Sequence, residues 1–216
     1  MKKKILVAVS LLLFAGLVYL AFNWKPLFLS WAGYVAPKAE STAAIVDYAE
    51  THRINAPYLA IAAGKREYNY LSKNFGVPGI IIFNKRQLPI KSSAGTSCTG
   101  VAHDFLNKLG SVDSFQVDSS NLSIRSLTDI LSRVKFLKQD SAALVSVLSG
   151  DVDYIAVHSW AKYLPKQSQA MAGVLNKVDF NKKKIALVSL NLDYSDLWMS
   201  QDSLDKDFQE MEIQFK

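Results

Sequence analysis

The sequence contains one cysteine, Cys98, among its 216 residues. A single cysteine cannot form an intramolecular disulfide, so the fold must be stabilised by its core, and redox chemistry would need a thiol from a partner. Glycine (10) and proline (6) are also scarce, while half of the residues are hydrophobic. We find no internal repeat and no low-complexity segment, so the sequence is that of one good-sized folded domain or two small ones.

Several sequence motifs that indicate a cofactor or an active site are missing. The chain has no G-x-x-x-x-G-K-[ST], no G-x-G-x-x-G and no G-x-S-x-G. Its three histidines, His52, His103 and His158, are not spaced as metal ligands. We therefore expect neither a cofactor nor a metal, and we interpret His158, directly after the apolar run 154–157, as a hydrogen-bonded histidine at a sheet end.

An excess of positive charge is present but concentrated at the start of the chain. Three of the six net positive charges come from Lys2, Lys3 and Lys4. The other basic residues are scattered among acids, except for the short run 182–184, which is typical of a solvated turn. Nucleic acid is therefore not an expected partner.

One long hydrophobic run follows those lysines. Residues 5–22 carry no charge, which is just long enough for a membrane-spanning helix. The lysines before the run predict a cytoplasmic N-terminus and an extracytoplasmic domain. We expect an uncleaved anchor at 1–22, a tether at 23–40 and a folded region at 41–216; the alternative is a cleaved signal peptide.

Hydrophobic periodicity predicts alternating helices and strands in the folded region, hence an α/β fold with a mixed central sheet in a three-layer sandwich. The expected helices are 41–54, 65–76, 97–110, 123–137, 140–150, 161–178 and 200–211. The expected strands are 57–63, the hairpin 79–84 with 89–93, 114–118, 152–159, 183–193 and 212–215.

Two stretches carry a resemblance to a known family. Residues 71–109 contain a helix, Phe-Gly-Val, a proline at the start of a strand, a hairpin and a final helix. Residues 153–198 contain a strand, Trp160-Ala161, an aromatic residue, a corner that leads into a helix, a further strand and Asn-x-Asp. Together they resemble the second and the first half of the thioredoxin-like superfamily, so Pro78 takes the place of that family's cis-proline.

The halves stand in reversed order, so the resemblance implies either a permuted single domain or two partial units, at 41–110 and 111–216. A permuted domain would have strands 80–84 and 153–158 in one sheet, with the Leu164 corner beside Pro78. The resemblance also favours an exported, membrane-anchored bacterial protein of the periplasm or cell surface.

The corner lacks the chemistry of the family. Where thioredoxins have Cys-x-x-Cys, this chain has Leu164 and Gln167 at the two cysteine positions. Neither side chain can attack or resolve a disulfide, so dithiol exchange is excluded. We interpret the corner as structural, with Tyr163 and Leu164 packed inward and Pro165 opening the helix, or as a retained peptide-binding groove. The expected function is a binding or assembly module with a protein partner.

Cys98 supplies the first alternative. It lies at the start of a predicted helix, where the dipole and free N–H groups lower the pKa of a thiol. It could exchange disulfides with a partner protein, or it could be a buried structural thiol.

A second alternative comes from residues 140–159. They resemble the helix, Gly-x-Val-Asp and strand element of periplasmic solute-binding proteins. The loop 94–100 would then cradle a small anionic ligand at a helix start.

Overall fold

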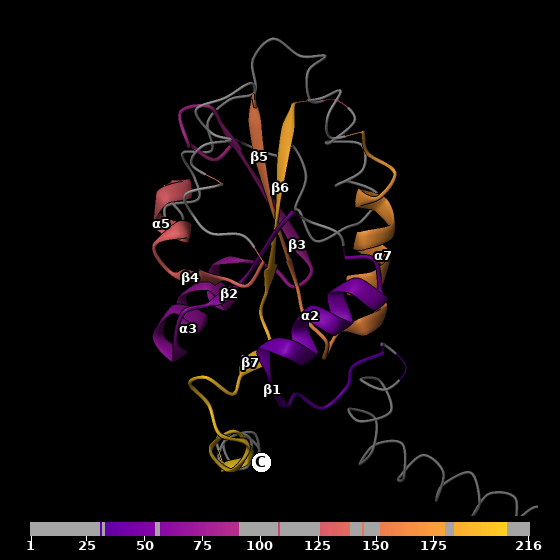
Figure 1. Cartoon of the computed structure of the whole chain (residues 1–216), viewed down its shortest axis with the longest axis vertical. Coiled ribbons are helices and arrows are strands. Elements are labelled where there is room, and N and C mark those ends of the chain that lie inside the picture. Colours follow the sequence, from indigo (N-terminus) through magenta and orange to yellow (C-terminus); the bar gives the residue numbers. More distant parts are fainter. Residues whose placement is uncertain are drawn as a thin grey trace, which may run out of the picture. The chain divides into compact units, whose positions relative to one another are not determined.

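The computed structural model describes residues 31, 33–54, 57–90, 108, 126–138, 144, 152–179 and 184–206. The chain forms two compact units, Met1–Val35 and Ala36–Lys216. In the first unit, Gly33 adopts a left-handed φ of 79° and the Trp31 side chain is exposed. The second unit contains the sheet and its helices (Figure 1).

The centre of the second unit is a mixed five-stranded sheet in the order β3-β5-β6-β2-β4. Its strands are β2 (Tyr58–Ala62), β3 (Gly79–Asn84), β4 (Val134–Phe136), β5 (Tyr154–Trp160) and β6 (Ile185–Asn191). Strands β5, β6 and β2 are parallel, whereas β3 and β4 run antiparallel to their neighbours. The predicted α/β class with a mixed central sheet is therefore confirmed.

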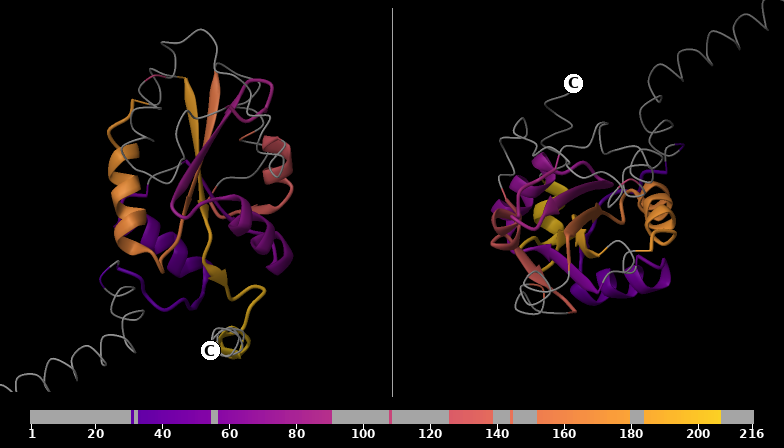
Figure 2. Two further views of the ribbon diagram at one scale, coloured as in Figure 1. Left: turned by 180° about the vertical axis from the view of Figure 1, so that it is seen from behind. Right: turned by 90° about the horizontal axis from the view of Figure 1, so that it is seen from above.

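Helices cover both faces of this sheet (Figure 2). One face packs against α2 (Thr42–Thr51) and α7 (Pro165–Leu175), and the other against α3 (Lys65–Asn74) and α5 (Leu127–Leu131). Because side chains alternate along a strand, each strand supplies both cores. The β5 residues Ile155 and Val157 face α3 and α5, while Ala156 and Trp160 face α2 and α7.

Helices α2 and α3 begin where the sequence predicts, whereas α5 and α7 begin four residues later, at Leu127 and Pro165. The Ser41 hydroxyl accepts a hydrogen bond from the Ala44 amide at 3.1 Å and caps α2. Pro165 occupies the first turn of α7, where its missing N–H costs nothing. The strand predicted at 152–159 is central, between β3 and β6.

A small second sheet includes the last two residues of the predicted tether, 23–40, which are therefore part of the folded unit. Strand β1 (Ala39–Glu40) pairs in parallel with β7 (Tyr194–Ser195). The Asp196 amide donates to the Glu40 carbonyl at 3.0 Å, and the Ala39 amide donates to Gln201 Oε1 at 2.9 Å. Gln201 begins a helical segment described over 201–206.

The prediction of a helix over 123–137 is wrong at its C-terminal end. The helix α5 stops at Leu131, and Val134–Phe136 form the edge strand β4, antiparallel to β2. Ser126 caps a single helical turn through the Asp129 amide. The alternation of Val134 and Phe136 around Lys135 then suits a half-buried strand better than a helix.

The expected hairpin at 79–93 is present as far as the structure describes it. Phe83 bridges to Pro89, and the Ile90 amide donates to the Ile82 carbonyl at 2.9 Å. Gln87 adopts a left-handed φ of 62° in the turn.

The predicted anchor at 1–22 and the predicted helices at 97–110 and 140–150 lie outside the described residues, apart from Lys108 and Leu144. The last predicted strand, 212–215, does too. Among the residues that are described, no helix has the length and apolar character needed to cross a bilayer.

Candidate functional site at the carboxyl edge of the sheet

The parallel strands β5 and β6 end side by side and their connections diverge. Strand β5 leads into α7 on one face, whereas the segment after β6 places Tyr194 and Trp198 against the core of the opposite face. In open α/β sheets such a divergence forms a crevice outside the carboxyl ends of the strands. Most of the residues singled out in the sequence lie at this edge.

The corner after β5 is tightly packed at its base. Trp160 and Ala161 are fully buried, and the Trp160 ring stacks on Tyr48 with centroids 5.7 Å apart. Ser168 accepts from the Ala161 amide at 3.2 Å and donates to the Ala161 carbonyl at 2.9 Å. The peptide after Trp160 is thereby fixed to the first turns of α7.

Two of the residues singled out in the sequence, Leu164 and Gln167, lie at the start of α7. Leu164 is the N-cap residue and Gln167 lies in the first turn. Both side chains are half-buried, as is Tyr163. The inward packing predicted for Tyr163 and Leu164 is therefore only partial.

Pro78 lies beside this corner. Strand β3 pairs antiparallel with β5 so that Gly79 is opposite Ser159, and the Ser159 hydroxyl donates to the Gly76 carbonyl at 2.5 Å. The Val77–Pro78 peptide bond is cis. A Cβ on Gly79 would lie 2.5 Å from the Gly76 oxygen, so only glycine fits this close approach.

A buried carboxylate supports the corner from the neighbouring strand. Asp193, which follows β6, accepts from the Lys162 amide at 3.0 and 2.9 Å and from Asn191 Nδ2 at 2.6 Å. Burial raises the pKa of the Asp193 carboxyl to about 6, although the hydrogen bond from Asn191 opposes the shift. Its oxygens are engaged by these donors, so Asp193 positions the corner.

The Lys162 side chain points to a third segment. Its Nζ donates to Glu40 Oε2 at 2.5 Å, and the two side chains are only 21% and 17% exposed. The same Nζ lies 5.6 Å from the centre of the Tyr48 ring. The corner is thus connected to β1, 122 residues earlier in the chain.

Aromatic residues flank the other side of the edge. Tyr68 of α3 contacts Tyr194 at 4.7 Å and Trp198 at 5.3 Å between ring centroids. Burial and a hydrogen bond with Tyr194 raise the pKa of the Tyr68 hydroxyl well above its ordinary value. This hydroxyl therefore stays protonated and cannot serve as a base.

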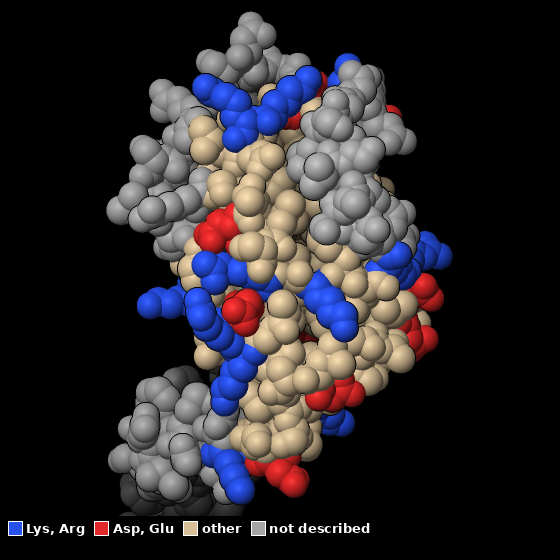
Figure 3. Space-filling model, turned by 60° about the vertical axis from the view of Figure 1, so that its left-hand side comes forward, with Lys and Arg blue, Asp and Glu red and all other residues tan. Residues whose placement is uncertain are grey.

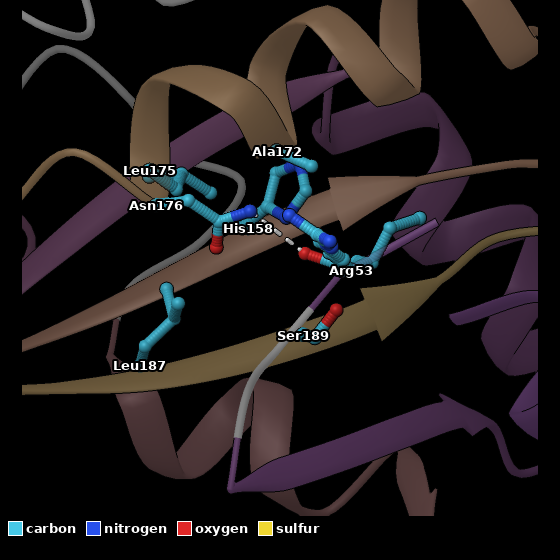
Figure 4. Close-up of a pocket in the computed structure, with 8 residues that line it drawn as sticks. Arg53, His158, Ala172, Leu175, Asn176, Leu187 and Ser189 are labelled. Atoms are coloured by element: carbon cyan, nitrogen blue, oxygen red, sulfur yellow. Dashed lines mark hydrogen bonds between the residues drawn. The ribbon is translucent and has the colours of Figure 1, made fainter. Parts of the chain in front are cut away.

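A second polar place lies inside the sheet layer that faces α2 and α7. His158 of β5 and Ser189 of β6 are register partners, and each is 1% exposed. They line a small pocket with apolar walls from Ala172, Leu175 and Leu187 (Figure 4). At its rim, Asn176 Nδ2 donates to the Arg53 carbonyl at 2.9 Å.

Within the part of the chain that is described, the hydrogen bonding expected of His158 is not found at its Nε2 atom. Neither His158 Nε2 nor Ser189 Oγ has a hydrogen-bond partner among the described residues. Burial lowers the pKa of His158 to about 3, so the ring is neutral at physiological pH. The apolar residues around it provide no counter-ion.

The pocket is too small for a substrate. Its volume of about 10 Å³ has room for roughly one water molecule. Within the described ranges, no three His, Cys, Asp or Glu side chains are grouped as metal ligands. The carboxyl edge is therefore the better candidate for a functional surface.

The surface over α3, α5 and β4 is mixed in charge. Lys and Arg side chains lie there beside Asp and Glu (Figure 3). Arg133 contacts Asp129 at 3.1 Å and lies 3.9 Å above the Tyr70 ring. This face has acidic groups next to its basic ones.

The sequence identified one part of this site and missed another. It singled out Trp160, Ala161, Leu164, Gln167 and Pro78, and the structure gathers all five at one edge. Cys98 and the loop 94–100 lie outside the described residues, so thiol exchange and anion binding there remain predictions.

The missed residues are Glu40, Lys162 and Asp193. Asn191 and Asp193 had a local signal, since two polar residues end a buried strand at the predicted site edge. Nothing local could have paired Glu40 with Lys162.

No family model, curated protein or solved structure matches this chain. What the fold defines is an α/β protein with a mixed five-stranded sheet and interleaved helices. Its function has to be argued from the carboxyl edge alone.

Proposed function

We propose that this chain is a thioredoxin-like binding or assembly module without dithiol chemistry, held at a membrane by residues 5–22, with its folded region on the extracytoplasmic side. The observation that carries the proposal is the antiparallel pairing of β3 with β5. It brings the Pro78 segment to the Leu164 corner within one sheet, as a permuted thioredoxin-like domain would require. The alternative, two partial units that share one sheet, would contain the same pairing.

The corner supports binding rather than exchange. Positions 164 and 167 are the N-cap and the first turn of α7, where a dithiol would act, and they hold leucine and glutamine. Both are half-buried, so a partner could contact them without unfolding the corner. The half-buried Tyr48, which stacks on Trp160 beside the edge, is of a residue type enriched at protein interfaces.

The thioredoxin-like geometry can be tested by restoring the missing thiols. In a Cys98→Ser background, the double variant Leu164→Cys/Gln167→Cys should form an intramolecular disulfide, measured by thiol titration against a glutathione redox buffer. The matched control places the pair one residue later, at Pro165→Cys/Ser168→Cys, where burial of Ser168 removes access to an exchange partner. A double variant that stays reduced in oxidised glutathione would contradict the proposed corner.

Binding at the corner can be tested by site-specific photocrosslinking in cells that produce the protein. A photoreactive amino acid at the exposed position Lys166, in the first turn of α7, should give a discrete adduct with a protein partner. The control position is Lys177, exposed just beyond the other end of α7. Equal labelling at both positions, or none at Lys166, would argue against a partner at this edge.

Membrane topology has its own test. In the Cys98→Ser background, a cysteine at the exposed position Lys73 should react with a membrane-impermeant maleimide in intact cells, whereas one at Lys3 should react only after lysis. Protection of both positions until lysis would overturn the extracytoplasmic assignment.

A further inference from the structure

Strand β1 covers part of the carboxyl edge with an unusually small set of contacts. It pairs with β7 through two residues only, Ala39 opposite Tyr194 and Glu40 opposite Ser195. Both β1 residues are half-buried. A strand this short contributes little cooperativity of its own, so it belongs to the least stable elements of the described unit.

Glu40 makes two distinct contacts with the site. Its main-chain carbonyl accepts from the Asp196 amide at 3.0 Å, and its carboxylate accepts from Lys162 Nζ at 2.5 Å. The first contact would be made by any extended chain in this position, and the second requires an acidic side chain. Together they use main-chain pairing for affinity and one charge for specificity, as in strand addition to a sheet edge.

We propose that β7 and Lys162 form a docking surface for an extended acidic segment of a partner protein, and that β1 occupies this surface in the resting chain. This inference rests on the proposed function, because it concerns the same carboxyl edge and names the chemistry of its partner. The partner segment pairs with β7 in place of β1 and puts an aspartate or glutamate on Lys162 Nζ.

The charges at the edge explain why the segment should be acidic. Lys162 is a largely buried cation whose Nζ lies against the Tyr48 ring, and its backbone amide is held by Asp193. Displacing Glu40 without a replacement would leave this cation without its carboxylate, and an unpaired buried charge is costly. A neutral or basic segment would therefore displace β1 less effectively than an acidic one.

The test uses two variants that break the same ion pair from opposite sides, with the photoreactive residue at Lys166 in the full chain. Glu40→Gln weakens β1 and leaves Lys162 for the partner, so the yield of the partner adduct should rise several-fold. Lys162→Gln weakens β1 equally but removes the cation, so the yield should not rise. Glutamine at position 40 keeps the size of glutamate and removes its charge, and at position 162 it removes the cation while keeping a side-chain N–H donor.

The outcomes separate this inference from the proposed function. If no adduct forms at Lys166 in any of the three proteins, wild type, Glu40→Gln and Lys162→Gln, the proposed function is refuted, and the docking surface with it. An adduct whose yield rises equally in Glu40→Gln and Lys162→Gln, or in neither, refutes the acidic docking surface and leaves the binding module intact.

A covalent lock provides a second measurement. Neighbouring strands are about 4.8 Å apart, within disulfide range, so Ala39→Cys/Tyr194→Cys in the Cys98→Ser background should fasten β1 to β7. The oxidised variant should lose the Lys166 adduct and regain it after reduction, whereas Tyr194→Cys alone should be unaffected by reductant. An adduct that persists in the locked protein shows that β1 does not occupy the docking surface.

Discussion

Two polar regions of the same protein, the carboxyl edge and the His158 pocket, differ in how their polar side chains are paired. At the edge, the charged side chains of Asp193, Lys162 and Glu40 each have a partner within hydrogen-bond distance, and these partners come from three distant segments. In the pocket, His158 Nε2 and Ser189 Oγ have none among the described residues. A strand end can recruit donors and acceptors from loops, whereas the middle of a sheet is surrounded by apolar neighbours.

Burial also affects the titratable group of each region, Asp193 at the edge and His158 in the pocket. Burial raises the pKa of Asp193 and lowers that of His158, so each shift disfavours the charged form. At the edge the charged form is still supported by hydrogen bonds, while in the pocket it is not. The edge is thus suited to electrostatic recognition and the pocket to keeping a neutral ring.

The largest expected effect comes from removing the carboxylate that supports the corner. Asp193→Ala leaves the Lys162 amide and the Asn191 side chain without their acceptor, and should cost about 3 kcal/mol of unfolding free energy. Asp193→Asn keeps one oxygen acceptor and should cost less than half as much. Urea denaturation at pH 7 measures both, and equal losses would show that the hydrogen bonds to Lys162 and Asn191 do not hold the corner.

The pH dependence of stability should separate the two places. His158 has a pKa of about 3 in the folded chain against an ordinary 6.5, so its contribution is present above pH 6.5 and is lost as the pH falls towards 3. Between pH 6.5 and 4.5 this loss amounts to about 2 kcal/mol, which His158→Leu should abolish. Urea titrations at several pH values measure the slopes.

Asp193 should act in the opposite direction. Its pKa is about 6 in the folded chain against an ordinary 3.8, so its contribution is fully present below 3.8 and is lost as the pH rises through 6. Asp193→Asn should therefore lose stability more steeply than the wild type between pH 6 and 4. Parallel curves for the wild type and both variants would mean that neither group titrates as its burial implies.

A pair of buried serines offers a matched comparison of smaller size. Ser168 exchanges two hydrogen bonds with Ala161 at the corner, whereas Ser189 lines the pocket without a partner among the described residues. Ser168→Ala should cost about 1–2 kcal/mol, and Ser189→Ala should be nearly neutral. Chemical denaturation measures both losses, and a larger loss of unfolding free energy for Ser189→Ala than for Ser168→Ala would contradict this expectation.

The smallest effect is expected at an exposed ion pair. Lys138 Nζ lies 2.8 Å from Glu50 Oε1, with side chains 37% and 61% exposed. Lys138→Ala should change the unfolding free energy by no more than about 0.5 kcal/mol, because solvent screens the pair. Thermal melts at low and high salt test this, and a large salt-sensitive loss would contradict it.

The predictable part of the fold is the part whose hydrophobic pattern decides it locally. Strands β5 and β6 are rich in apolar residues, and Pro165 marks the start of α7, so the strand, corner, helix and strand unit could be predicted. Strand β4 could not, because its three residues continue an apolar pattern that also fits a helix, and only pairing with β2 decides between them.

The same division holds within the site. The corner residues were visible as a motif, whereas the ion pair of Glu40 with Lys162 depends on how β1 meets β7. The state of His158 likewise depends on its neighbours across the sheet. Its position after an apolar run predicts burial, but the missing partner of its Nε2 atom depends on the surrounding residues of α7, of β6 and of the segment after α2.

The edges of the main sheet have a consequence for how copies of the protein coexist at high concentration. Strand β4 is only three residues long and presents Lys135 outward, and the described strand β3 is bordered by Pro89, which has no N–H to offer a ladder. Both features discourage sheet edges from joining. Molecules at high concentration would therefore meet through side chains and resist amyloid-like growth.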